Sequence, residues 1–126
     1  MKVFVKKGNL GDTKSQAIIL PLFEDNKKLT GIALEIDKLS CGQISELLEN
    51  GDFEAKPSQI SVIYTRENLP AKRVALVGLG KQKEFTLEKL RAAFARVMRH
   101  LRDMNVKEAA VSIHLNLIPG KKEQVA

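Results

Sequence analysis

The longest regular pattern of apolar and polar positions in this chain lies between Thr86 and Met104. At about 100° per residue, one arc of roughly 140° carries all the large apolar side chains of the segment, namely Leu87, Leu90, Phe94, Val97, Met98, Leu101 and Met104. Lys89, Arg96, Arg99, His100 and Asp103 fall opposite. Thr86 can cap this helix, Glu88 suits its positive end, and Asn105 can close it. The pattern predicts an amphipathic helix with one face on a core.

Shorter apolar runs predict β-strands around this helix. The runs lie at Lys2–Lys6, Ala17–Leu22, Gln59–Thr65, Arg73–Gly78 and Glu108–Leu115. A second helix is expected from about Gln43 to Asn50, where Gly51 can end it, with a helical or turn-like lead-in from Leu34. The loop from Arg66 to Lys72 allows a hairpin-like return into the next strand.

The resulting order, β–β–α–β–β–α–β, indicates an α/β fold with a mixed sheet flanked by helices. The last strand should be parallel to the Arg73–Gly78 strand and reached by a right-handed crossover. Its side chains alternate between two faces. Ala109, Val111, Ile113 and Leu115 point to the core, and Ala110, Ser112, His114 and Asn116 point the other way. That second face is either an exposed or edge surface, or a contact with another domain or subunit.

Composition narrows the class of protein. The chain has 126 residues, 44% of them hydrophobic, with no Trp, one Tyr and five Phe, so one domain with an aliphatic core is expected. No run of about 18 apolar residues could span a membrane, and the charged start is unlike a signal peptide. The single Cys41 excludes an internal disulfide and fits a reducing cytoplasm.

The net charge of +6 raises the question of an acidic partner. The basic residues are scattered and no aromatic residues alternate with them, so a solvated surface is the favoured interpretation. Nucleic-acid binding through the Lys89, Arg96 and Arg99 helix face stays open as the less favoured one. The spacing of Cys41, His100 and His114 matches no zinc pattern, so no metal site is expected from them.

The turn Gly78-Leu79-Gly80-Lys81 follows an apolar strand and precedes a helix, which is where phosphate-binding loops lie. A dinucleotide fingerprint needs a third glycine where Lys83 stands. A P-loop needs glycine at Ala75 and Ser or Thr at Gln82. Both patterns fail, so we interpret Gly78, Gly80 and Lys81 as a structural turn and find no catalytic residues in the chain.

Three segments resemble the N-terminal domain of the leucyl (cytosol) aminopeptidase family. The first is the strand and helix start from Arg73 to Lys81 and from Phe85 to Ala93, similar to the family's "R-V-x-L-V-G-L-G-K" and "T-L-E-K-L-R-A-A". The second is Ile44–Phe53, whose end "G-D-F" matches the family's helix. The third is Ala17–Phe23. These matches extend over almost the whole chain in the family's order.

The resemblance implies a macro-domain-like fold and a parent enzyme that removes N-terminal residues from peptides with two divalent metals, zinc or manganese, as a cytoplasmic hexamer. The family's metal-binding signature, similar to "N-T-D-A-E-G-R", has no counterpart here. We therefore expect residues 1–126 to be one non-catalytic N-terminal domain without a cofactor, and the catalytic C-terminal domain to lie outside this chain. Its partners would be that catalytic domain and neighbouring subunits, with Ser112, His114 and Asn116 as a contact. The alternative is a nucleotide-, ADP-ribose- or nucleic-acid-binding module, since true macro domains bind ADP-ribose.

Overall fold

The computed structural model describes residues 2–6, 16–25, 29, 31–65 and 71–112. Its strands are β1 (Lys2–Lys6), β2 (Ala17–Leu22), β3 (Ile60–Tyr64), β4 (Arg73–Gly78) and β5 (Glu108–Ser112). Its helices are α1 (Gly31–Leu39), α2 (Gln43–Asn50) and α3 (Leu87–Asp103), with a short 3-10 turn η2 (Gln82–Glu84). The strands and the two helices predicted from the sequence, α2 and α3, are therefore present, within one or two residues at the ends that are described.

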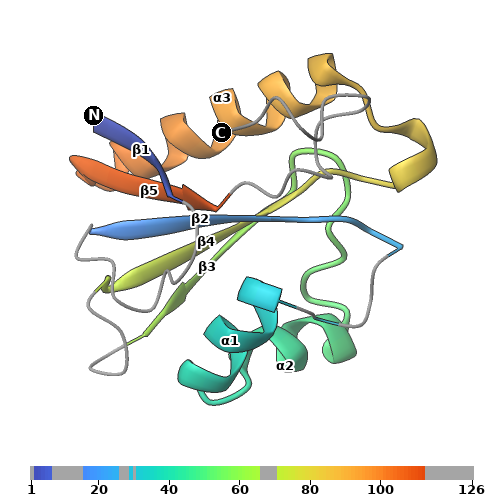
Figure 1. Ribbon diagram of the computed structural model, residues 1–126, viewed down its shortest axis with the longest axis horizontal. Coiled ribbons are helices and arrows are strands. Elements are labelled where there is room, and N and C mark those ends of the chain that lie inside the picture. The colour runs from blue at the N-terminus through green and yellow to red at the C-terminus, as the bar shows by residue number, and fades with distance from the viewer. Residues whose placement is uncertain (1, 7–15, 26–28, 30, 66–70, 113–126) are drawn as a thin grey trace.

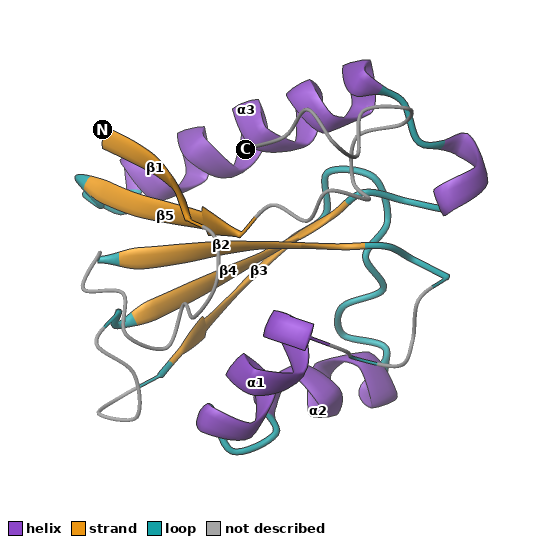
Figure 2. Ribbon diagram, in the orientation of Figure 1, coloured by secondary structure: helices purple, strands orange, loops and turns teal. Residues whose placement is uncertain are grey.

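The strands form one five-stranded sheet in the order β1-β5-β2-β4-β3. Strands β1, β5, β2 and β4 are parallel, and β3 pairs antiparallel with β4. Helix α3 covers one face of the sheet, and α1 and α2 cover the other (Figures 1 and 2). The predicted mixed α/β sheet, the hairpin-like return into β4 and the parallel direction of β5 are all confirmed.

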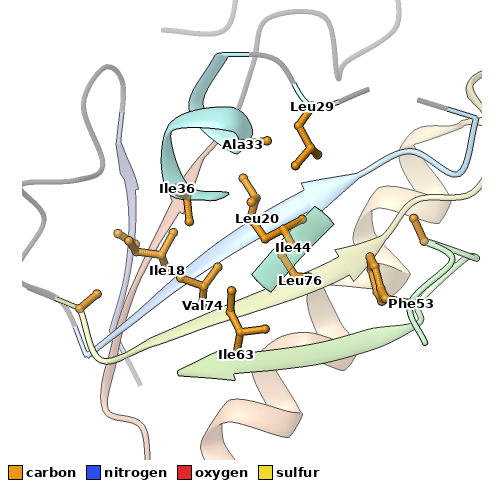
Figure 3. Packing of buried hydrophobic residues seen from close by; sticks show 13 residues of the cluster. Ile18, Leu20, Leu29, Ala33, Ile36, Ile44, Phe53, Ile63, Val74 and Leu76 are labelled. Atoms are coloured by element: carbon orange, nitrogen blue, oxygen red, sulfur yellow. The ribbon is translucent and has the colours of Figure 1, made fainter. Parts of the chain in front are cut away.

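Each face of the sheet has its own apolar core. Side chains alternate across β2 and β4, so Ile18, Leu20, Val74 and Leu76 pack with α1 and α2, whereas Ile19, Ala75 and Val77 pack with α3. Figure 3 shows the first core, in which Phe53 closes one end. Because β2 and β4 are covered on both faces, they read as continuous apolar runs rather than as alternating ones.

Helix α3 begins and ends where its sequence predicts. The Thr86 hydroxyl oxygen accepts a 3.2 Å hydrogen bond from the Lys89 amide, and Asn105 takes a left-handed conformation (φ 64°) after the last turn. Val97 and Leu101 are fully buried against the sheet. Leu87 was predicted to lie on the same buried face, but it is 42% exposed. It stands in the first turn, where the helix has only begun to approach the sheet.

The lead-in to α2 is a helix of its own, α1, and the two are linked by a polar contact. Asp37 is buried, with 6% of the residue exposed, and its carboxylate accepts hydrogen bonds from the Ser45 amide (3.0 Å) and the Ser45 hydroxyl (2.5 Å). Gly42, the residue before α2, has no side chain that could cap the helix. Asp37, in the preceding helix, therefore provides the hydrogen-bond acceptor for a backbone amide in the first turn of α2.

Two features concern the edges of the sheet. Strand β5 lies between β1 and β2 and is not an edge. Ala110 is 1% exposed, within the core beneath α1 and α2, so the expectation of an exposed or contact surface is wrong at that residue. The edges of the sheet are β1 and β3. At the β3 edge, the side-chain amide of Gln43 donates a 3.0 Å hydrogen bond to the carbonyl oxygen of Tyr64.

Candidate functional site

The turn after β4 leaves no room for side chains at its glycines. A Cβ atom on Gly78 would lie 2.0 Å from the carbonyl oxygen of Lys56. Gly80 has a positive φ of 77°, and a Cβ atom there would lie 2.8 Å from Cγ of Pro57. The segment Phe53–Gln59, which we call the covering loop, is therefore in direct contact with the turn, and this contact requires glycine at both positions.

The backbone amides of the turn are already engaged. Gly78 donates to the carbonyl oxygen of Gln59 (2.8 Å), Leu79 to that of Leu22 (2.9 Å), and Gly80 to that of Ala55 (3.0 Å). A phosphate-binding loop needs such amides to point at its ligand. Here the same donors are used to join β4 to β2 and to the covering loop, so the geometry fits a structural turn.

A cavity of about 640 Å³ lies beside this turn, at the carboxyl ends of β2 and β4. Its apolar lining comes from Phe23, Leu48 and Phe53, and Phe23 is held by an edge-to-face contact with Phe85 (5.1 Å between ring centres). Its charged lining comprises Glu24, Asp25, Glu49, Glu54 and Lys81. With four carboxylates and one ammonium group among the described lining residues, the cavity is poorly suited to a phosphate-bearing ligand.

Of the predicted contact residues, the structure describes only Ser112, whose backbone lies away from this site. Ser112 ends β5 and pairs with Lys6 of β1, and β2 separates β5 from β4. His114 and Asn116 lie outside the described residues. The contact role of Ser112, His114 and Asn116 thus stays a prediction.

Possible metal ligands are dispersed over the described part of the chain. Cys41 is exposed in the turn between α1 and α2, and His100 is exposed on α3, across the sheet. No group of three or more His, Cys, Asp or Glu side chains among the described residues is arranged to hold a metal ion. None of the described helices is long and apolar enough to cross a membrane.

The sequence of this chain is similar to that of a known protein family. The sequence model of the N-terminal domain of the cytosol aminopeptidase family matches residues 19–125. The chain belongs to the cytosol aminopeptidase family. The match begins within β2 and continues past β5, so it covers both faces of the sheet and the glycine turn.

Curated cytosol aminopeptidase relatives agree with this assignment. A probable cytosol aminopeptidase of Idiomarina loihiensis is 38% identical over 109 residues, which is 86% of this chain and 22% of the relative. One from Bacillus subtilis is 34% identical over 97 residues, 77% of this chain and 19% of the relative. The chain thus spans about a fifth of the length of these relatives.

Solved structures support the fold of this cytosol aminopeptidase domain. A mutant of tomato leucine aminopeptidase matches with a TM-score of 0.69 at 17% identity, over 88% of this chain and 22% of that one. The macrodomain of Mycobacterium tuberculosis DarG matches with a TM-score of 0.68 at 17% identity, over 86% of this chain and 74% of that one. The expected macro-domain-like architecture is therefore confirmed.

Sequence reasoning missed the covering loop and the cavity beside it. The loop follows its path because Ala55 (φ 59°) and Ser58 (φ 62°) adopt left-handed conformations that favour glycine. No glycine or asparagine marks either position. The cavity combines residues from the ends of β2, α2 and β4, and only the fold brings these segments together.

Proposed function

We propose that this domain is the non-catalytic N-terminal part of a two-metal leucyl aminopeptidase that removes N-terminal residues from peptides. The observation that carries the proposal is the family match over residues 19–125. The relatives extend well beyond the part that this chain resembles, so the proposed enzyme has ample further sequence for a catalytic centre.

In such an enzyme two divalent metals, zinc or manganese, activate water and polarise the scissile carbonyl. The described residues of this domain do not fit that group, because their acidic and histidine side chains form no cluster able to hold a metal. We therefore assign no catalytic step to them. The metal ligands of the proposed enzyme belong to its catalytic domain.

The role we propose for the domain is assembly and control of access to the active site, within a cytoplasmic hexamer. A rigid accessory domain suits this role, since its two cores fix the positions of the surface elements on both sides of the sheet. The partners would be the catalytic domain and neighbouring subunits, with Ser112, His114 and Asn116 as candidate contacts.

The test replaces the matching region of the Idiomarina loihiensis relative with this chain and measures hydrolysis of leucine p-nitroanilide with added manganese or zinc. The control is the same relative with that region deleted. The fusion should be active and hexameric by light scattering, and the deleted form should lose assembly or activity. The chain alone should show no turnover and no hexamer. Turnover by the pure chain, or a stable hexamer of it, would refute the accessory role.

The alternative function, binding of ADP-ribose, a nucleotide or nucleic acid, takes its support from the similarity to macrodomain structures. At 17% identity this similarity concerns the fold only. The engaged amides of the glycine turn and the acidic lining of the cavity speak against a phosphate-bearing ligand at that edge. We therefore rank it second.

A further inference from the structure

The two helical layers of the domain carry exposed groups of charged side chains of opposite sign. On α3, Arg96, Arg99 and Arg102 are exposed and recur every three residues; we call them the arginine row. On the other side, Glu46 in the first turn of α2, Glu49 in its last turn and Asp52 just beyond its end are exposed; we call them the acidic row. Helix α3 and helix α2 cover opposite faces of the sheet (Figure 1).

Neither row is neutralised within the described part of the molecule. The ion pairs found there are Glu54 with Lys56 (3.5 Å) and Glu88 with Arg91 (3.1 Å), and neither contains a member of the two rows. An arginine presents a planar fork of donors that fits a carboxylate with two hydrogen bonds. Each of the three arginines is therefore able to bind a carboxylate of a partner molecule.

The arginine row lies wholly on α3, and Glu46 and Glu49 of the acidic row lie on α2, so the positions of these residues are largely fixed before any contact. Val97 and Leu101, which alternate with the arginines, are fully buried in the core under α3. Ile44 is fully buried under α2, and the Gly51 amide closes that helix on the carbonyl oxygen of Leu48 (3.3 Å). The negative end of the α2 dipole lies near Glu49 and Asp52 and adds to the negative potential there, whereas Glu46 stands in the first turn of the helix.

We propose that the arginine row of one copy of this chain docks on the acidic row of a second copy. Since the rows lie on opposite faces, the contact is head-to-tail, and each copy keeps one row free for a further copy. A second copy is favoured over nucleic acid because this chain itself presents an exposed acidic row of complementary charge, and because the exposed Asp103 at the end of α3 repels phosphates. The proposal does not depend on the peptidase role.

The contact is weak in free solution and sensitive to salt. It is built from charged surface pairs, which contribute little individually and are screened by ions. The net charge of +6 on each copy opposes association. The contact becomes effective where copies are already held together, because a high local concentration compensates for low affinity.

The experiment is sedimentation velocity on the chain, from about 20 μM to about 1 mM protein, in about 0.05 M and about 0.5 M sodium chloride. The sedimentation coefficient of the natural chain should rise with concentration at low salt and stay constant at high salt. Two charge-reversed variants follow. One carries Arg96→Glu, Arg99→Glu and Arg102→Glu, and the other carries Glu46→Arg, Glu49→Arg and Asp52→Arg.

Each reversed variant alone should show no rise, because its two rows then have the same sign. An equimolar mixture of the two should regain the rise, because each variant's reversed row then complements the other's. A matched control, Lys72→Glu with Lys83→Glu and Lys107→Glu, changes the net charge as much as the first variant does, at exposed sites outside the rows, and should associate at least as well as the natural chain.

Circular dichroism checks folding, and Arg→Gln and Glu→Gln versions of each row replace any reversed variant that fails to fold. The Arg→Gln version should lose the rise. No concentration dependence in the natural chain, or no recovery in the mixture, would overturn the proposal. A 20-base-pair duplex is added as a further probe. Duplex binding that depends on the arginine row, without self-association, would overturn it in favour of nucleic acid.

Discussion

The carbonyl oxygen of Ala55 accepts a 3.0 Å hydrogen bond from the amide of Gly80. This bond joins the covering loop to the turn after β4 and uses a donor that a phosphate would otherwise need. Ala55 is 1% exposed and holds a left-handed conformation (φ 59°), so the loop reaches the turn at the cost of local strain. The amide of Gly80 is therefore held in a hydrogen bond by a residue that is itself packed in the core.

The closed turn predicts that the domain does not bind ADP-ribose or mononucleotides. Calorimetry with these ligands should show no heat of binding at micromolar protein, because no amide of Gly78, Leu79 or Gly80 is available. Gly80→Val provides the control. Binding in the natural chain that disappears in this variant would contradict the structural role of the turn and support the alternative function.

Substitution of Gly78 by Ala should destabilise the domain strongly. The added Cβ would stand 2.0 Å from the backbone oxygen of Lys56, and backbone cannot move aside as a flexible side chain does. We expect a loss of about 3 kcal/mol or more in the free energy of unfolding. Urea denaturation measures this loss.

Gly42→Ala serves as the control for Gly78→Ala. Gly42 also has a positive φ, 79°, but no atom lies within 4 Å of an added Cβ there. The Gly42→Ala variant should lose only about 1–2 kcal/mol in the free energy of unfolding, because of backbone strain alone. Equal losses for the two variants would show that the covering loop yields easily.

Substitutions on α3 should separate its two faces. Leu101 is fully buried, so Leu101→Ala should lower the free energy of unfolding by about 3–5 kcal/mol. Phe94 is only partly buried, so Phe94→Ala should cost less than the 3–5 kcal/mol typical of a buried Phe. Arg96→Ala should change stability by about 0.5 kcal/mol or less. Similar losses in the free energy of unfolding for Leu101→Ala and Arg96→Ala in denaturant melts would mean that α3 is rotated about its own axis, away from the orientation that the structure shows.

The contact between Asp37 and Ser45 should stabilise the α1–α2 pair. Asp37→Ala removes both acceptors that satisfy the start of α2, and we expect a loss of about 1–3 kcal/mol. Ser45→Ala keeps the bond to the amide and removes only the one from the hydroxyl, so it should cost less. Thermal unfolding of both variants beside the natural chain provides the measurement. A larger loss for Ser45→Ala would be inconsistent with the capping role.

Most helices and strands of this fold are predictable from local patterns, because the spacing of apolar residues along the chain is enough to indicate them. The 3.6-residue period of α3 and the doubly covered runs of β2 and β4 are visible without tertiary information. The position of β5 inside the sheet is not, because a strand at an edge and a strand beside a further parallel strand can have the same sequence. Ala110 was misassigned because the alternation along β5 does not reveal that α1 and α2 cover that face of the sheet.

The site was predictable only at its glycines. Gly78 and Gly80 identify a tight turn, but the atoms that fill the space around them belong to Lys56 and Pro57, in a loop without a recognisable motif. Asp37 accepts hydrogen bonds from Ser45 of α2, eight residues further along the chain, which is beyond the range of ordinary capping patterns. Such contacts depend on how separate segments meet, which no local pattern records.

The hydrogen bond from Gln43 to Tyr64 has a consequence for molecules at high concentration. Strand β3 is short and ends the sheet, and an uncovered edge of this kind invites irreversible pairing with a strand of another molecule. The amide of Gln43 occupies a carbonyl group that such an intruding strand would need. A strand from another copy of the domain would have to displace this bond before it could pair with the end of β3, which disfavours the merging of sheets at that edge.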